Sequence, residues 1–259
     1  MARYFIEMAY KGTNYVGWQC QKSGNTIQQT LENALKIILN QDINITGAGR
    51  TDSGVHAKYM VAHFDVPETL TDSSKIIYSL NEILPDDVAI KSVTQVNDDA
   101  HSRFSAISRR YEYHICSQKD PFLFDYVTFI KYNLNIETMN EAAKILLKYN
   151  DFTSFGKLHS NNKTNICCIK QSYWEIRDDR TVYVIEANRF LRNMVRSIVG
   201  TLLDVGRKKI NIQQFITIIE SLDRSKVSAS APAQGLYLVD IQYPEEIFKR
   251  QKTTAYPLR

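Results

Sequence analysis

The sequence predicts an α/β (α+β) fold made of two ferredoxin-like split βαβ domains, whose antiparallel sheets meet around a central cleft. Strand-like and helix-like runs follow one another in the order β-α-β-β-α-β, the split unit of ferredoxin-like domains. After residue 110 the same order begins again, with one extra helix. The chain has 259 residues, of which 44% are hydrophobic, and it is therefore long enough for two moderate cores.

Residues 1–104 are the expected N-terminal domain. Thr26 and Gln29 have the spacing of a capping box, and the apolar residues that follow recur at helical spacing to about Asn40. The remaining elements follow from strand-like alternation and from Gly and Pro breaks. We expect strands at 3–9, 42–46, 58–65 and 88–96, and helices at 26–40 and 71–80.

Residues 105–259 are the expected C-terminal domain, because the polar stretch 97–110 interrupts the pattern before it begins again. The tail beyond Pro244 is expected to be a frayed helix. The other elements are strands at 111–116, 166–177, 181–188 and 236–241, and helices at 136–149, 190–205 and 211–222.

Composition narrows the class of protein. No run of about eighteen apolar residues occurs, and Arg3 and Glu7 interrupt the N-terminus, so we expect no membrane segment, no signal peptide and a cytoplasmic location. The four cysteines lack Cys-x-x-Cys spacing and the five histidines lack ligand spacing, which predicts neither a disulfide framework nor a metal site. A net charge of +4 is compatible with a nucleic-acid partner.

One loop is the strongest functional candidate. Residues 47–57 read GAGRTDSGVHA, so Gly49 and Gly54 bracket a stretch that contains Arg50 and Asp52. Glycine allows tight turns, and we expect the loop to project Asp52 from strand ends into a cleft. The alternative is an ordinary turn, because Asp and Ser beside Gly are common turn formers.

Basic residues gather in the second half. Arg189, Arg192 and Arg196 are spaced i, i+3 and i+7, which places them on one face of the helix expected at 190–205. Like charges at this spacing repel one another, so the stripe indicates either an anionic partner or a solvated face. The run 207–209 (RKK) can meet phosphates or end a helix.

The loop and seven further blocks, in the same order along the chain, resemble the TruA-type tRNA pseudouridine synthases. The resemblance covers nearly the whole chain. The blocks are residues 10–19 (YKGTNYVGWQ), 80–85 (LNEILP), 101–106 (HSRFSA), 109–113 (RRYEY), 151–155 (DFTSF), 188–200 and 231–238 (APAQGLYL).

The resemblance implies roles for single residues. Asp52 matches the catalytic residue, Arg196 pairs with it and favours its charged form, and Arg50 acts on the RNA and assists base flipping. Tyr111 lies over the target uracil and Leu236 lies on the other side of that pocket, although from the sequence alone either could be a core residue. Further candidates for RNA contact are Arg103, Arg110, Arg189 and Arg192.

The resemblance also implies the reaction and the partners. The expected enzyme isomerises uridine to pseudouridine in the anticodon stem-loop of tRNA (tRNA positions 38–40), as a homodimer without a membrane partner. No group enters or leaves in this reaction, so we expect no metal and no nucleotide or other cofactor. Gly47 and Gly49 also lack the third glycine of a dinucleotide fingerprint. Asp52 could attack C1′, deprotonate C2′ or add to C6.

Two other classes of protein compete with this interpretation. The triplet Asp52-Ser53-Gly54 occurs in aspartic proteases, but these need two facing copies, and the chain has one. A non-catalytic RNA-binding module is suggested by the paired split domains, but the aromatic RNA-binding string of such modules is absent from the sequence.

Overall fold

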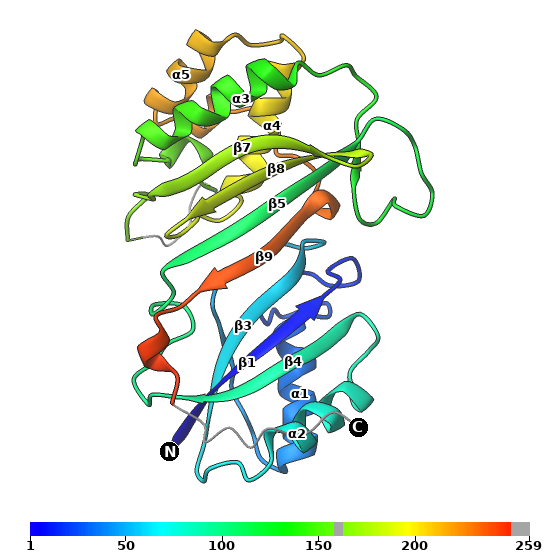
Figure 1. Ribbon diagram of the computed structural model, residues 1–259, viewed down its shortest axis with the longest axis vertical. Helices are drawn as coiled ribbons and strands as arrows, with labels where there is room; N and C mark the ends of the chain where they lie inside the picture. Colours follow the sequence, from blue (N-terminus) through cyan, green and yellow to red (C-terminus); the bar gives the residue numbers. More distant parts are fainter. Residues whose placement is uncertain (158–162, 250–259) are drawn as a thin grey trace.

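The computed structural model describes residues 1–157 and 163–249, and its strands join in one mixed sheet (Figure 1). The strand order is β4-β1-β3-β9-β5-β8-β7, with β2 paired to β3 and β6 paired to β5. The strands are β1 (Ala2–Tyr10), β2 (Thr46–Gly47), β3 (His56–Val66), β4 (Val88–Val96), β5 (Ser108–Cys116), β6 (Thr128–Phe129), β7 (Ile169–Arg177), β8 (Arg180–Ala187) and β9 (Leu236–Gln242).

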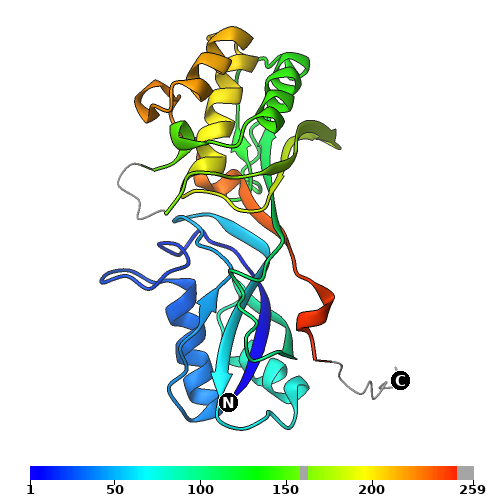
Figure 2. The ribbon, with the colours of Figure 1, turned by 90° about the vertical axis from the view of Figure 1, so that its left-hand side faces the viewer.

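Helices cover one side of this sheet. α1 lies behind β1 and β3, and α3, α4 and α5 lie behind β5, β8 and β7, as Figure 2 shows from the side. α2 packs on β4 and beside α1. The helices are α1 (Ile27–Leu39), α2 (Ser73–Ile83), α3 (Ile136–Ile145), α4 (Met194–Gly206) and α5 (Ile212–Glu220).

The two halves of the chain are joined through β9. Its first residues pair with β3 in parallel, with Tyr237 opposite His56 and Leu238 opposite Ala57, while its other edge pairs with β5. One hydrophobic core lies with α1 and includes Leu238, and a second lies with α3–α5 and includes Val55. The predicted α/β class is confirmed. The halves share one sheet, and the boundary at 104/105 stays a prediction.

The order of the elements agrees with the sequence prediction, but several bounds differ. The strand expected at 42–46 is reduced to Thr46–Gly47, and the helix expected at 136–149 ends at Ile145 and continues as a 3₁₀ turn to Lys148. Within the tail, a short 3₁₀ turn covers Glu245–Ile247, and the part of the predicted frayed helix from 250 onward lies outside the described residues.

The helix expected at 190–205 begins only at Met194, and this changes the position of two arginines. Asn193 adopts a left-handed conformation with φ 65°, which ends any helical path before it. Arg189 and Arg192 therefore lie in the connection before α4, and only Arg196 lies on the helix. The predicted three-arginine stripe was wrong.

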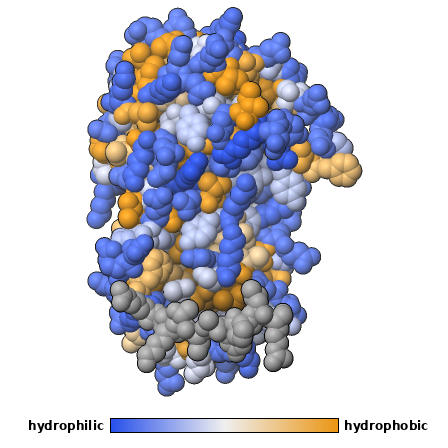
Figure 3. All heavy atoms as spheres, in the orientation of Figure 1, coloured by the Kyte–Doolittle hydropathy of each residue, from blue (hydrophilic) through white to orange (hydrophobic). Residues whose placement is uncertain are grey.

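The face of the sheet without helices is mainly hydrophilic (Figure 3). Glu112 points to this face, since its neighbour Tyr113 is buried in the core with α3–α5. Arg177 lies 2.8 Å and His114 3.0 Å from its carboxylate. Burial raises the pKa of Glu112, but hydrogen bonds from His114 and Arg177 outweigh this effect and bring the pKa to about 2. The Glu112 carboxylate is therefore already bonded to basic partners on this face.

A buried histidine fastens the segment that leads into the 47–57 loop. The Nδ1 atom of His63 accepts a hydrogen bond from the Ser102 N–H at 3.2 Å. The Ser102 hydroxyl donates to the Thr46 carbonyl at 2.7 Å, just before the loop. Burial, together with the nearby charges of His101 and Arg3, lowers the pKa of His63 to about 4, although the charge of Asp65 opposes this decrease.

Protonation of His63 should couple stability to pH. The unfolded chain takes up this proton near its ordinary pKa of 6.5, whereas the folded protein does so only near 4. The free energy of unfolding should therefore have its highest value above about pH 6.5. It should decrease as the pH falls towards 4, by up to about 3 kcal/mol. Urea unfolding at several pH values measures this slope. His63→Asn, which keeps an acceptor without a titrating ring, should lose most of it, and an unchanged slope would contradict the assignment.

Candidate active site

The loop that carries Asp52 is fastened by the segment after β1. The Trp18 N–H donates to the Thr51 carbonyl at 3.2 Å, and the Tyr10 hydroxyl lies 2.8 Å from the Thr51 hydroxyl. The Tyr15 carbonyl accepts from the Gly54 N–H at 3.3 Å and from the Ser53 hydroxyl at 3.1 Å. The block at 10–19 and the block at 47–57 therefore form one unit, with Asp52 at its tip.

Two glycines are needed to build this unit, and one of them was not expected. Gly54 has φ +77°, and Gly17 has φ +103°. A Cβ on Gly17 would lie 2.6 Å from the Thr51 carbonyl oxygen, so a side chain there would push against the backbone of the loop. Gly49 has no positive φ, and a Cβ there would meet nothing within 4 Å. The chain bends at Gly49 as expected, but this bend does not require a glycine.

Two arginines from the other half of the chain approach the Asp52 carboxylate. The Arg196 Nη1 atom lies 3.4 Å from one carboxylate oxygen, and the Arg192 Nε atom lies 3.8 Å from the other. The side chains of Asp52 and Arg196 are 24% and 21% exposed, whereas that of Arg192 is 53% exposed. Asp52 and Arg196 are thus largely sheltered, and Arg192 reaches them from the rim.

The backbone after α5 holds Arg196 in place. Its Nε atom donates to the Ala231 carbonyl at 2.7 Å, and the Ala231 N–H donates to the Arg196 carbonyl at 3.0 Å. This loop lies directly on α4, since a Cβ on Gly200 would come within 2.0 Å of the Ala229 carbonyl oxygen. The sequence contains the APAQGLYL block, but it gave no sign that the first residue of that block orients Arg196.

Asp52 lines a cleft of about 1070 Å³ whose walls come from both halves of the chain. Among the described lining residues, Asp52 carries the one carboxylate, whereas four arginines and one lysine are basic. The cleft therefore has an excess of positive charge, which suits a polyanion. The lining residues are Val16, Gln19–Gln21, Arg50–Ser53, Lys157, Arg192, Asn193, Arg196, Arg224 and Ser230.

The aromatic and apolar candidates lie at the joint between the halves. Tyr111 on β5 is half-buried and meets Phe190 edge to face, with ring centroids 5.2 Å apart. Burial raises the pKa of Tyr111 to about 12; Arg109 opposes this rise, and the charge of Asp52 adds to it. Leu236 is 5% exposed and packs in the second core.

The remaining basic candidates lie in different surroundings. Arg50 is exposed and lines the cleft; burial lowers its pKa, as do the charges of Arg103 and Arg192. The Arg189 guanidinium donates to the Thr164 carbonyl at 3.1 Å. Arg110 alternates with Tyr111 along β5, so it points to the opposite face of the sheet, where it donates to the Tyr173 hydroxyl at 3.3 Å. The structure brings Arg192 and Arg196 to Asp52 and leaves Arg50 in the lining of the same cleft, whereas it does not place Arg110 there.

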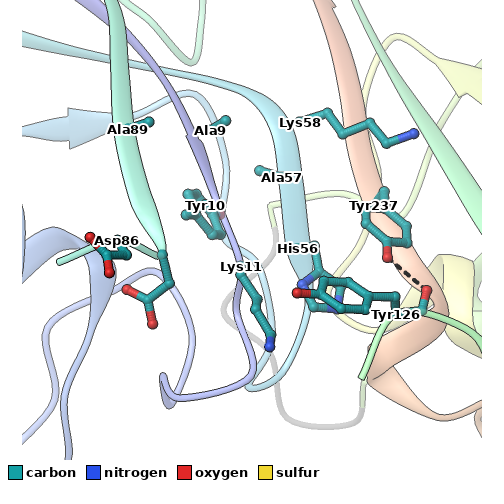
Figure 4. A pocket seen from close by; sticks show the side chains of 11 residues that line it. Ala9, Tyr10, Lys11, His56, Ala57, Lys58, Asp86, Ala89, Tyr126 and Tyr237 are labelled. Atoms are coloured by element: carbon teal, nitrogen blue, oxygen red, sulfur yellow. Dashed lines mark hydrogen bonds between the residues drawn. The ribbon is translucent and has the colours of Figure 1, made fainter. Parts of the chain in front are cut away.

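A smaller hollow of about 250 Å³ lies at the ends of β1, β3 and β4 (Figure 4). His56 packs in its wall against Tyr237, with ring centroids 4.7 Å apart. His56 Nδ1 accepts the Gly12 N–H at 3.1 Å, so Nε2 carries the proton and donates to the Asp125 carbonyl at 3.0 Å. These bonds anchor the end of the GAGRTDSGVHA stretch, and none of the predicted site residues lines this hollow.

The geometry around Asp52 bears on two predictions, the competing aspartic protease class and the lack of a metal site. The ion pairs of Asp52 within the described chain are with arginines, whereas an aspartic protease needs a second carboxylate facing the first. In residues 1–157 and 163–249, no three His, Cys, Asp or Glu side chains group as a metal site would require. The predicted lack of a metal stays a prediction.

Fold and site together define a class of protein. An α/β scaffold presents one sheltered carboxylate between guanidinium groups, in a large cleft with excess positive charge. This arrangement is typical of an enzyme that acts on an anionic polymer rather than of a passive binding surface.

Comparison with known proteins identifies the family. The family described as "tRNA pseudouridine synthase" matches residues 7–105 and 142–244. The chain is 49% identical over 248 residues to tRNA pseudouridine synthase A of Parabacteroides distasonis, covering 96% of this chain and 98% of that protein. It is 50% identical to the protein of the same name from Azobacteroides pseudotrichonymphae (96% and 100% covered), and 42% identical to that of Thermoanaerobacter sp. (94% and 100% covered).

The chain belongs to the tRNA pseudouridine synthase family. Membership confirms the predicted enzyme class, an RNA-modifying isomerase, and excludes the protease and the non-catalytic RNA-binding module as its main function. No helix in the described part of the chain is long and apolar enough to span a membrane.

The glycine geometry yields a direct test. Gly17→Ala should lower the free energy of unfolding by about 1–3 kcal/mol, because the new methyl group is forced against the loop backbone at a positive φ. Gly49→Ala is the matched control and should change it by less than about 0.5 kcal/mol. Chemical denaturation of both variants gives the comparison. Equal losses would show that the contact with Thr51 does not constrain the loop.

Proposed function

We propose that this protein converts uridine to pseudouridine in the anticodon stem-loop of tRNA, as a cytoplasmic homodimer that needs no cofactor. The observation that carries the proposal is the placement of Asp52 between Arg192 and Arg196 in a basic cleft. Family membership supports the reaction class, and the cleft supports an RNA substrate. The anticodon arm, the dimer and the location rest on the resemblance described above.

In this reaction the bond from N1 to C1′ breaks, the freed uracil turns, and C5 bonds to C1′; C5 then loses its proton and N1 gains one, so the product is an isomer of the substrate. Asp52 is the nucleophile or base in each of the three conceivable paths, at C1′, C2′ or C6. Arg196 favours the ionised carboxylate, because a nearby opposite charge stabilises that form. Its position supports this role, since the Ala231 backbone rather than the carboxylate sets the direction of its guanidinium.

The target base has to leave the RNA stack before it can react. Flipping costs a few kcal/mol, which stacking on an aromatic ring can offset. Tyr111 is the proposed stacking partner, with Leu236 on the other side of the uracil. Arg50 lines the cleft two residues from Asp52, which supports its proposed role of occupying the vacated position in the RNA.

The cleft residues select tRNA by shape and phosphate contacts. Arg103, Arg189 and Arg192 are proposed to meet phosphates near the modified arm. Arg110 was predicted to join them, but it lies on the helix-free face, so such a contact requires RNA to reach that face as well. Stacked uracil, phosphate contacts and one carboxylate together account for the activity.

Replacement of the carboxylate tests the proposed function. Asp52→Asn should lower pseudouridine formation on unmodified tRNA transcripts at least about a thousandfold, because the amide cannot act as nucleophile or base. The tRNA dissociation constant should stay within about threefold. Asp65→Asn removes another arginine-paired carboxylate far from the cleft and should retain turnover. Turnover retained by Asp52→Asn would remove Asp52 from its role.

The two arginines around Asp52 should behave differently. Arg196→Ala should lower the single-turnover rate constant by about 10²–10³-fold, since it removes a sheltered charge beside the reacting group. Arg192→Ala should mainly weaken tRNA binding and reduce the salt slope of binding by about one, as expected for one lost phosphate contact. Rate and affinity measured over a salt series separate the two effects. Identical behaviour of both variants would refute the division of roles.

A further inference from the structure

Arg109 has a bonding pattern that the proposed mechanism does not use. Its guanidinium donates to four backbone carbonyls. One terminal nitrogen bonds to Ala106 at 3.1 Å and Asn188 at 2.8 Å, and the other bonds to Ala48 at 3.1 Å and to Arg103. None of the ion pairs in the described residues involves Arg109. The hydrogen bonds of its two terminal nitrogens are therefore all made to main-chain oxygens.

Two of these carbonyls, those of Ala48 and Asn188, belong to segments that lead into the cleft. Ala48 lies two residues before Arg50 and four before Asp52. Asn188 lies four residues before Arg192, at the start of the connection to α4. Arg103 and Ala106 belong to the 101–106 block. One side chain thus links the catalytic loop of the first half, the connection between the halves and the arginine-bearing segment of the second half.

Burying the Arg109 guanidinium to form this link costs free energy, which argues that the link has a specific role. Burial lowers the pKa of Arg109, meaning that its surroundings disfavour the charge. Four hydrogen bonds from a rigid planar fork offset this cost, whereas a lysine ammonium could not reach all four carbonyls from one point. The contacts that depend on the link are loose by comparison: Asp52 meets the second half at 3.4 Å and 3.8 Å.

We infer that Arg109 is a positioning residue, whose guanidinium holds the Asp52 loop and the 188–196 segment at the separation that the reaction requires. Arg109 lies on the same strand face as Tyr111, two residues away, so it sits beside the proposed uracil site without touching the reacting atoms. The inference rests on the proposed function. It adds a residue that acts through Asp52, Arg192 and Arg196.

The test compares Arg109→Met and Arg109→Lys with Arg3→Met. Arg3 is a suitable control, because its guanidinium also fastens main chain, at the Ala100 carbonyl, together with Asp65, and it lies away from the cleft. Single-turnover rate constants and dissociation constants are measured on the same unmodified tRNA transcript, at a temperature where all variants are folded by circular dichroism.

Arg109→Met should lower the rate constant about 100-fold, the loss expected when a reacting group is displaced by about 1 Å, while the dissociation constant changes by less than about threefold. Arg109→Lys should recover at most about a tenth of the wild-type rate constant, because charge alone does not restore the fork. Arg3→Met should keep the rate constant within about threefold, even if it melts at a lower temperature.

The outcomes separate this inference from the proposed function. Absence of pseudouridine with the wild-type protein would overturn the proposed function itself. An active wild type, together with an Arg109→Met variant that loses no more rate than Arg3→Met, would overturn the positioning role alone. Equal losses of rate and tRNA affinity in Arg109→Met would also overturn it, since they would assign Arg109 to RNA binding.

Discussion

The Asp52 carboxylate can lie sheltered in a cleft only because guanidinium groups from the other half of the chain approach it. A partly buried carboxylate without a partner is unfavourable, and its own loop offers only Arg50, which is exposed and forms no ion pair in the described chain. The cations therefore have to come from the segment that ends in α4. Every feature that fixes the two halves relative to one another is for this reason also a feature of the site.

The shared sheet is the first of these features. Strand β9 belongs to the second half by sequence, yet it pairs with β3 on one side and β5 on the other, so its backbone cannot move with one half alone. His56 stands at this junction, bonded to Gly12 and Asp125 and stacked on Tyr237. The Asp52 loop thus joins β3 at a junction that is held from several sides, which suits a loop that has to present one group accurately.

Local patterns allowed much of this to be predicted, and long-range contacts account for what was missed. The order of strands and helices follows from periodicity, and the Asp52 loop follows from one short stretch, because both are written in neighbouring residues. The left-handed Asn193, which removes Arg192 from the helix, donates a hydrogen bond to the distant Ser230 hydroxyl, a contact that no local pattern shows. The same holds for the bond from Arg196 to Ala231 and the four bonds of Arg109, whose partners lie up to 79 positions away along the chain. Helical spacing could not reveal any of these.

Carboxylates are bonded more closely on the helix-free face of the sheet than in the cleft. This difference explains how the Asp52 carboxylate stays accessible to a substrate. On the helix-free face, Glu112 is held by close bonds at 2.8 Å and 3.0 Å, and its pKa is brought to about 2. In the cleft, Arg196 donates its short hydrogen bond of 2.7 Å to the Ala231 carbonyl, and its guanidinium lies 3.4 Å from the Asp52 carboxylate. A guanidinium at that distance still attracts the negative charge, but it does not occupy the carboxylate oxygens as a close bidentate pair would. The Asp52 oxygens are thereby left free to approach a substrate.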